Sequence, residues 1–296
     1  MDYALDFIDD PADFLDAARG HLAAEPVLST VVATFAERQV RERAAGVAPL
    51  EGFPQWWLVV RDGNGEVVGA GMRNAPFEPH PPYLLAMPDE AAGQLARELH
   101  DRGEELGGVN GALPAARIVA EEYARLEGLT ARVHEATRLC ELGELEEPAL
   151  PGGQLRMAGA DDLDLALEWY VAFGREAAEQ AGREDEHAMF EDEAGMLRRI
   201  EDGRVWFWLD EHGERVHLTG HNLPSLGVAR IGPVFTPKVH RGNGYASAAV
   251  AEVSRMLRDA GSRVTLFTDQ ANPTSNAIYQ RIGYRPVADQ ANLVIG

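Results

Sequence analysis

The sequence has little cysteine, few basic residues and no long apolar run. Its single cysteine among 296 residues is Cys140, so a disulfide within the chain and a zinc site built from several cysteines are excluded. No apolar segment approaches the roughly 18 residues that a membrane-spanning helix needs. The first residues are acidic and lack the basic, apolar pattern of a secretion signal. We therefore expect a cytoplasmic protein with no membrane partner.

Basic residues are outnumbered by acidic ones. The chain has 27 Lys and Arg against 48 Asp and Glu, which gives a formal net charge of -21. Nucleic acid binds basic surfaces, so we do not expect it as a partner. The negative charge would suit a cationic ligand, although a solvated acidic surface is its simpler explanation.

The chain reads as two halves with the same order of elements. Length suggests about two domains of ~150 residues, and residues 144–153 combine acidic residues, two prolines and two glycines, as linkers do. We predict domains at 1–145 and 154–296 with a linker at 146–153. In each half, hydrophobic periodicity predicts helices, a β-hairpin, a strand, a helix, a strand, a helix and a closing strand. We interpret this order as an internal structural repeat of a mixed α/β fold. In the first half we predict a hairpin at 56–72, strands at 83–87, 108–113 and 131–142, and helices at 88–106 and 114–126. In the second half we predict a hairpin at 204–221, strands at 226–236, 264–268, 284–287 and 292–295, and helices at 245–260 and 273–282.

A strand-like run in the second half leads through a glycine-containing loop into a helix. N–H groups at a helix start carry partial positive charge, and glycine lets the backbone approach an anion closely. An arginine in the loop adds a full charge. The segment therefore predicts a phosphate-binding site. Its residues are Val234, Phe235, Thr236, Arg241, Gly242, Asn243, Gly244, Tyr245, Ala246 and Ser247.

Two common phosphate loops do not match this segment. A dinucleotide-binding fingerprint requires a third glycine where the chain has Ser247, and it places its glycines directly at the end of the strand. A nucleotide-hydrolase loop requires a lysine after Gly244, where the chain has Tyr245.

A second motif follows one helix and one strand later. Its residues are Asn272, Ser275, Ile278, Tyr279, Gly283 and Tyr284. Together with the segment from Arg241 to Ala246, this pattern resembles the GNAT superfamily of acyl-CoA-dependent N-acyltransferases over about residues 153–296. The chain departs from the family pattern at Ser275, Ile278 and Tyr284, where the family has Ala, Leu and Phe.

The resemblance implies two GNAT-like domains in tandem, each with a mixed, mostly antiparallel sheet flanked by helices. It implies acetyl-CoA as the acyl donor, with no metal, and a strand edge at 234–236 that pairs with the pantetheine arm and polarises the thioester carbonyl. Asn272, Asn276 and Tyr279 would bind the cofactor, and Tyr279 would protonate the departing thiolate. Alternatively, Asn272 could serve only as a helix cap and Tyr279 only as a core side chain.

The sequence does not identify the acceptor substrate or the catalytic base that would take a proton from it. The acceptor would be a small-molecule or peptide amine, and a cationic one would suit the charge of the chain. A water chain could replace a single base, and a structural or solvated role is the simpler interpretation of each candidate. Two tryptophans on one strand face, Trp206 and Trp208, could line the acceptor pocket or the core. The candidate bases are Glu168, Glu176, His187, Glu191, His217 and His221.

The first half lacks the phosphate loop. Asp89 and Glu90 lie where a phosphate would bind, and their charge would repel it. Tyr123 has no asparagine partner at the spacing of the second motif. We expect a degenerate, non-catalytic copy that acts as scaffold, acceptor-site wall or homodimer surface. One working site would then transfer acetyl to a primary amine. The alternative is a non-catalytic acyl-CoA-binding or sensor module, which would have no need of Tyr279 as an acid.

Overall fold

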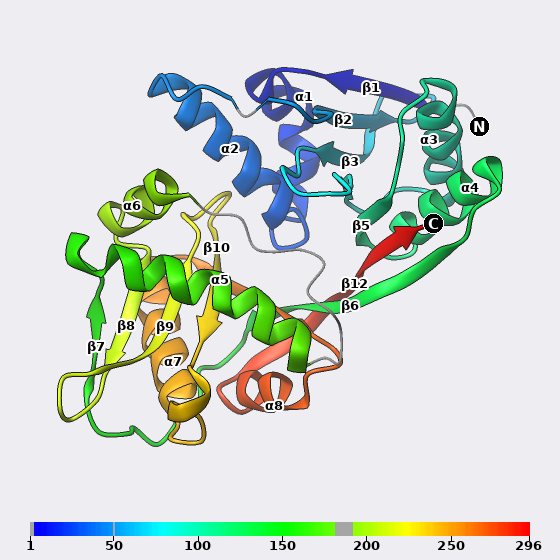
Figure 1. Ribbon diagram of the computed structural model, residues 1–296. Coiled ribbons are helices and arrows are strands. Elements are labelled where there is room, and N and C mark those ends of the chain that lie inside the picture. Colours follow the sequence, from blue (N-terminus) through cyan, green and yellow to red (C-terminus); the bar gives the residue numbers. More distant parts are fainter. Residues whose placement is uncertain (1–2, 50, 181–191) are drawn as a thin grey trace. The chain divides into compact units, whose positions relative to one another are not determined.

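Figure 1 shows a computed structural model of the chain, which describes residues 3–49, 51–180 and 192–296. The chain divides into two compact units. The first comprises residues 1–138 together with 288–296, and the second comprises residues 139–287. Within the described ranges, every helix is too short or too polar to cross a membrane.

Unit 1 is a mixed sheet with two helices on each face. The parallel neighbours in this sheet are β4 and β5, whereas β1–β2, β2–β3, β3–β4 and β5–β12 are antiparallel. The strand order is β1-β2-β3-β4-β5-β12-β6. The elements are β1 (Ala4–Ile8), α1 (Pro11–Ala24), α2 (Thr30–Ala44), β2 (Trp56–Arg61), β3 (Val67–Arg73), β4 (Tyr83–Leu84), α3 (Asp89–Asp101), β5 (Gly108–Ala112), α4 (Ala115–Glu127), β6 (Ala131–Leu142) and β12 (Tyr284–Ile295).

The apolar run in β2 is continuous because both faces of this sheet are covered. Trp57 and Val59 pack against α1 and α2, whereas Leu58 and Val60 pack against α3 and α4. A strand buried on both faces has no polar side to alternate with the apolar one.

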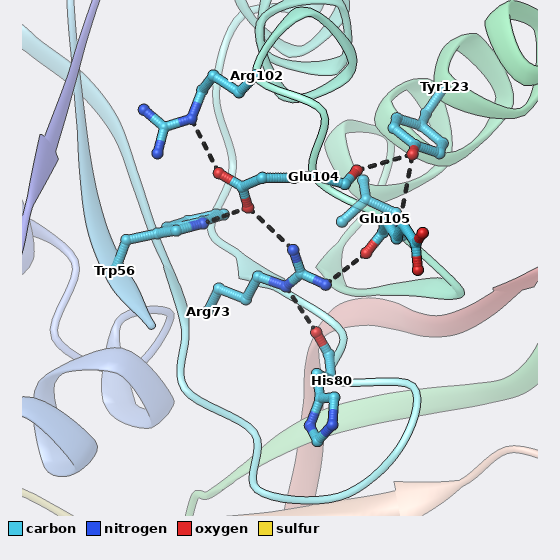
Figure 2. Close-up of polar contacts among 8 residues, drawn as sticks. Trp56, Arg73, His80, Arg102, Glu104, Glu105 and Tyr123 are labelled. Carbon is cyan, nitrogen blue, oxygen red and sulfur yellow. Dashed lines mark hydrogen bonds and ion pairs between the residues drawn. The ribbon is translucent and has the colours of Figure 1, made fainter. Parts of the chain in front are cut away.

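A buried polar network fastens two loops of unit 1 (Figure 2). Arg73 is 2% exposed. Its Nε donates to the carbonyl of His80 at 2.9 Å, and its Nη1 and Nη2 donate to Oε2 of Glu104 at 2.9 Å and to the carbonyl of Glu105 at 2.6 Å. The hydroxyl of Tyr123 donates to the carbonyl of Glu104 at 2.7 Å. The tyrosine of α4 is therefore part of the scaffold of unit 1.

Unit 2 repeats the element order of unit 1. Its parallel pair is β10–β11, whereas the pairs β7–β8, β8–β9 and β9–β10 are antiparallel. Its strand order is β7-β8-β9-β10-β11, followed by the end of β6 and then the start of β12. The new elements are β7 (Gln154–Met157), α5 (Leu163–Gln180), α6 (Glu193–Glu201), β8 (Val205–Leu209), β9 (Arg215–His221), β10 (Val228–Phe235), α7 (Tyr245–Asp259), β11 (Arg263–Asp269) and α8 (Pro273–Arg281).

The two faces of β8 have different neighbours. In Figure 1, α5 crosses the front of this sheet and α7 lies behind it. Phe207 packs with Trp169 of α5 and Met196 of α6, whereas Trp206 and Trp208 belong to the clusters beneath α7. Of the two interpretations of these tryptophans, the structure supports core packing.

The predicted repeat is confirmed, and the two compact units have other bounds than the predicted domains in two places. Residues 288–296 belong to unit 1, because Gln290 to Val294 of β12 pair with β5. Conversely, residues 139–142 of β6 belong to unit 2, whose sheet places β6 beside β11. The two closing strands predicted at 284–287 and 292–295 form one strand, β12, that contributes to both units.

Candidate active site

β10 separates from its parallel neighbour halfway along its length. The parallel ladder between β10 and β11 ends at Ile231 and Leu266, whereas the antiparallel ladder with β9 continues to Phe235. The register with β9 shifts between Ile231 and Val234, as in a β-bulge, which bends a strand. The edge of β10 that faces β11 is therefore open beyond the bulge, and an extended amide-bearing ligand could pair with it.

The loop after β10 adopts a conformation that requires its glycines. Gly242 and Gly244 have φ angles of 83° and 85°, in the left-handed region that other residues rarely adopt. A Cβ built at either position would meet no atom within 4 Å. The first hydrogen bond of α7 runs from the N–H of Ala248 to the carbonyl of Gly244 at 3.1 Å. The N–H groups of the preceding turn therefore have no partner within the helix, and their residues line the cavity described below, where they can bind an anion.

Arg241 extends from this loop towards α5. Its Nε donates to the carbonyl of Thr236 at 2.9 Å, and its Nη2 donates to Oε2 of Glu176. The arginine side chain is 34% exposed and the glutamate side chain 14% exposed. The sequence singled out both residues, but it did not indicate that they form an ion pair.

A buried histidine holds the end of β10. Nδ1 of His217 lies 2.7 Å from Oγ1 of Thr236, and Nε2 lies 2.6 Å from Oγ1 of Thr219. The ring is fully buried, and burial lowers its pKa to about 3. His217 is therefore neutral at physiological pH and connects the core to Thr236.

Tyr279 lies on α8 at the edge of the core. It is 9% exposed and belongs to the hydrophobic cluster that contains Cys140 and Tyr284. Its ring lies edge-on to that of Tyr284, with the ring centroids 6.1 Å apart. Burial raises the pKa of Tyr279 above its ordinary value, and the nearby Cys140 adds to this effect. The phenol therefore remains protonated at neutral pH, as a proton donor must.

The two asparagines of the second motif have different roles. Oδ1 of Asn272 accepts the N–H of Ser275 at 3.1 Å and so caps α8, while the residue also lines the cavity described below. Nδ2 of Asn276 donates to the carbonyls of Asp269 at 3.0 Å and Asn272 at 2.8 Å. Asn276 is absent from the cavity wall. Its amide thus fixes the turn between β11 and α8, and its contact with the cofactor stays a prediction.

These elements surround one cavity of about 1060 Å³ in unit 2. All the other residues predicted to bind the cofactor line it, from Val234 to Thr236, from Arg241 to Ser247, and at Asn272 and Tyr279. Several residues that the sequence did not single out as a site also line it. These are Glu146, Glu147, Pro148, Ala149, Phe173, Ala177, His240, Pro273, Thr274, Arg281 and Ile282.

Part of the predicted linker thus forms a wall of the cavity. The N–H of Glu146 donates to the carbonyl of Ile282 at 3.1 Å. Glu147 forms an ion pair with Arg255 of α7, with Nε and Oε1 3.1 Å apart. Residues 146–149 are held against α7 and α8 by these contacts, and their composition gave no indication of this position.

Of the candidate bases, Glu176 lines the cavity. Glu168 is exposed and lies outside the cavity wall, and His221 is buried with Nδ1 3.1 Å from the carbonyl of Asn222. His217 contacts the cavity only through Thr236. Two further candidates, His187 and Glu191, lie outside the described residues.

The corresponding junction in unit 1 is shorter. Four residues, 85–88, separate β4 from α3, whereas nine residues, 236–244, separate β10 from α7. α3 begins with Asp89 and Glu90 in its first turn, and these carboxylates already satisfy the positive end of the helix. A Cβ at Gly111 of β5 would lie 2.1 Å from the carbonyl oxygen of Leu84, so β4 and β5 approach closely here. The features that form the cavity in unit 2 are not reproduced at this junction.

Comparisons with known proteins agree with this description. Residues 213–293 match the family model of FR47-like proteins. No curated protein matches the sequence. A GNAT-family acetyltransferase from Colwellia psychrerythraea has a TM-score of 0.55 and 14% identity, with 99% of each chain covered. A GCN5-related N-acetyltransferase from Sphaerobacter thermophilus has a TM-score of 0.56 and 17% identity, with 98% of this chain and 94% of that chain covered.

A further solved structure matches both units. It is a tandem GNAT protein from the clavulanic acid biosynthesis pathway, with a TM-score of 0.53 and 16% identity, and the match covers 99% of this chain and 98% of that chain. At such identities the likeness concerns the fold. The resemblance that the two motifs predicted is thus confirmed: the chain has the fold of GNAT acetyltransferases, repeated in tandem.

Proposed function

We propose that unit 2 transfers an acyl group, most simply acetyl, from acetyl-CoA to a primary amine. The main support for this proposal is that the open edge of β10, the glycine loop before α7 and Tyr279 all line one cavity. Its volume of about 1060 Å³ is at the upper end of the roughly 300–1,000 Å³ usual for small-molecule sites. That volume suits a long donor together with a second substrate.

The residues fit coenzyme A. The N–H groups at the start of α7 and the guanidinium of Arg241 would hold its pyrophosphate. The open edge of β10 at Val234 and Phe235 would pair with the amides of its pantetheine arm. Acetyl-CoA would supply an activated thioester, and a backbone N–H on this edge would stabilise the negative charge that develops on the carbonyl oxygen.

Tyr279 would act as the general acid. Because burial raises its pKa, the phenol stays protonated and can donate to the departing thiolate. An amine that attacks the thioester must also lose a proton. Among the described residues, Glu176 is the predicted base candidate that lines the cavity, but it already pairs with Arg241. We therefore propose that solvent carries this proton.

The test measures release of free thiol from acetyl-CoA with a broad panel of primary amines, including cationic ones. Tyr279→Phe should lower kcat by about 100-fold or more, since general acids contribute roughly 10²–10⁴-fold, and it should leave the affinity for coenzyme A nearly unchanged. Tyr284→Phe is the matched control, because its hydroxyl lies 2.8 Å from Oγ of Ser254 in the core and outside the cavity wall. Equal losses in both variants would contradict the acid role.

The same assay separates the alternative function. If the protein binds acetyl-CoA with micromolar affinity but no amine of the panel releases thiol, the chain is an acyl-CoA-binding module. In either case we propose that unit 1 has no catalytic site of its own, because its β4–α3 junction is short and acidic.

A further inference from the structure

The lysine and the arginine of the loop between β10 and α7 both pair with carboxylates of α5. Arg241 pairs with Glu176. Lys238 pairs with Glu179, with Nζ and Oε2 2.7 Å apart. The two glutamates are three positions apart, so they lie on neighbouring parts of one helix surface. The loop proposed to bind an anion therefore already faces two anionic side chains.

The two ion pairs differ in their surroundings. Glu176 and Arg241 both line the cavity, and their side chains are 14% and 34% exposed. Glu179 and Lys238 are 61% and 55% exposed and lie outside the cavity wall. The inner pair is thus in the position where a bound phosphate would meet it, whereas the outer pair is a solvated surface contact.

We infer that Glu176 competes with the pyrophosphate of coenzyme A for Arg241, an inference that rests on the proposed function. A guanidinium binds carboxylate and phosphate through the same fork of donors. Two anions on one guanidinium repel each other, so phosphate binding must weaken or break the contact with Glu176. The pyrophosphate prevails because the N–H groups at the start of α7 bind it as well.

This competition gives Glu176 a function in turnover. A carboxylate that recaptures Arg241 lowers the affinity for every form of coenzyme A, including the free thiol that is the product. Release of product limits the rate of many enzymes. Glu176 is thus a positioning residue that assists release of coenzyme A, and it need not touch the reacting atoms.

The test is the affinity for coenzyme A alone, measured by calorimetry at one ionic strength. Ion pairs of this exposure contribute up to about 1 kcal/mol, so Glu176→Gln should bind coenzyme A about three- to fivefold more tightly. The dissociation rate, measured by displacement, should fall by a similar factor. Glu179→Gln is the matched control and should change the affinity less than twofold.

A second background separates competition from simple repulsion. In an Arg241→Gln protein, coenzyme A should bind more weakly, and adding Glu176→Gln should tighten binding by less than it does in the native protein. The inference would be overturned if Glu176→Gln raised the affinity for coenzyme A as much in the Arg241→Gln protein as in the native protein. It would also be overturned if the single Glu176→Gln variant bound coenzyme A more weakly than the native protein. Failure of the native protein to bind coenzyme A would instead refute the proposed function.

Discussion

Two buried side chains of the site are kept neutral by their surroundings. Burial lowers the pKa of His217 to about 3 and raises that of Tyr279 above its ordinary value. The histidine therefore cannot serve as a base at the cavity, and its two hydrogen bonds to threonine hydroxyls make it a support for Thr236. The tyrosine retains the proton that its proposed role requires.

His217 predicts a specific dependence of stability on pH. Between its unfolded pKa of about 6.5 and its folded pKa of about 3, the unfolded chain binds a proton that the folded chain excludes. The free energy of unfolding should therefore fall as the pH falls, by about 1.4 kcal/mol per unit from this residue.

The measurement is urea unfolding of the native protein and of His217→Gln at pH 7 and pH 5. Although the variant is less stable at pH 7, it should lose about 2 kcal/mol less than the native protein between the two pH values. His21 and His221, whose pKa values burial also lowers, titrate in both proteins and cancel. Parallel pH dependence in the two proteins would mean that His217 is not buried and neutral.

Among the elements, the start of α7 carries a second prediction. Gly244 has a φ of 85° and open space around its Cβ position. Gly244→Ala should cost about 1–2 kcal/mol of stability from backbone strain and, in addition, place a methyl group where the phosphate approaches. We expect the affinity for coenzyme A to fall at least tenfold.

The end of the same helix supplies the control. Gly261 has a φ of 89° and also open space around its Cβ position, but it lies outside the cavity wall. Gly261→Ala should cause a similar loss of stability, seen as a lower melting temperature, with unchanged affinity for coenzyme A. If both variants lose affinity equally, strain in α7 rather than contact with the ligand would explain the effect.

Local sequence patterns predicted most elements and singled out residues that line one cavity. The hairpin 56–72 appears as β2 and β3, and the glycine loop and Tyr279 lie on one cavity, because turn chemistry and motif spacing depend on neighbouring residues. Contributions from distant segments were not predictable. Phe173 and residues 146–149 reach the cavity through tertiary contacts, and Nδ2 of Asn276 donates to backbone carbonyls, which the motif spacing did not indicate.

At the scale of the whole molecule, the sequence did not reveal the exchange of closing strands, in which the end of β12 belongs to unit 1 and the end of β6 belongs to unit 2. Each unit needs a strand beside β5 or β11, and β6 and β12 are both 12-residue strands. Strand patterns identify a strand but not its partner, and pairing depends on contacts at long sequence separation. The partner of β5 proved to be β12, from the far end of the sequence.

The exchange predicts where a mutation near the C-terminus acts. Leu293 of β12 is 3% exposed and packs in the cluster formed by α3, α4 and β5. Leu293→Ala should cost about 2–5 kcal/mol and increase hydrogen exchange in α3 and α4, while α7 and α8 keep their protection. Val287→Ala, on the same strand but 42% exposed, is the control. Increased exchange confined to α7 and α8 would contradict the assignment of residues 288–296 to unit 1.

The exchanged strand also bears on the order in which the protein is made. Unit 1 has all its other strands once β6 has been synthesised, but residues 288–296 are still about 150 residues away. At roughly 5–20 residues per second, β5 waits on the order of ten seconds with an unpaired edge, which is a hazard for association with other chains. Of the two units, the one that is translated earlier is therefore completed only after the residues of the other have been translated.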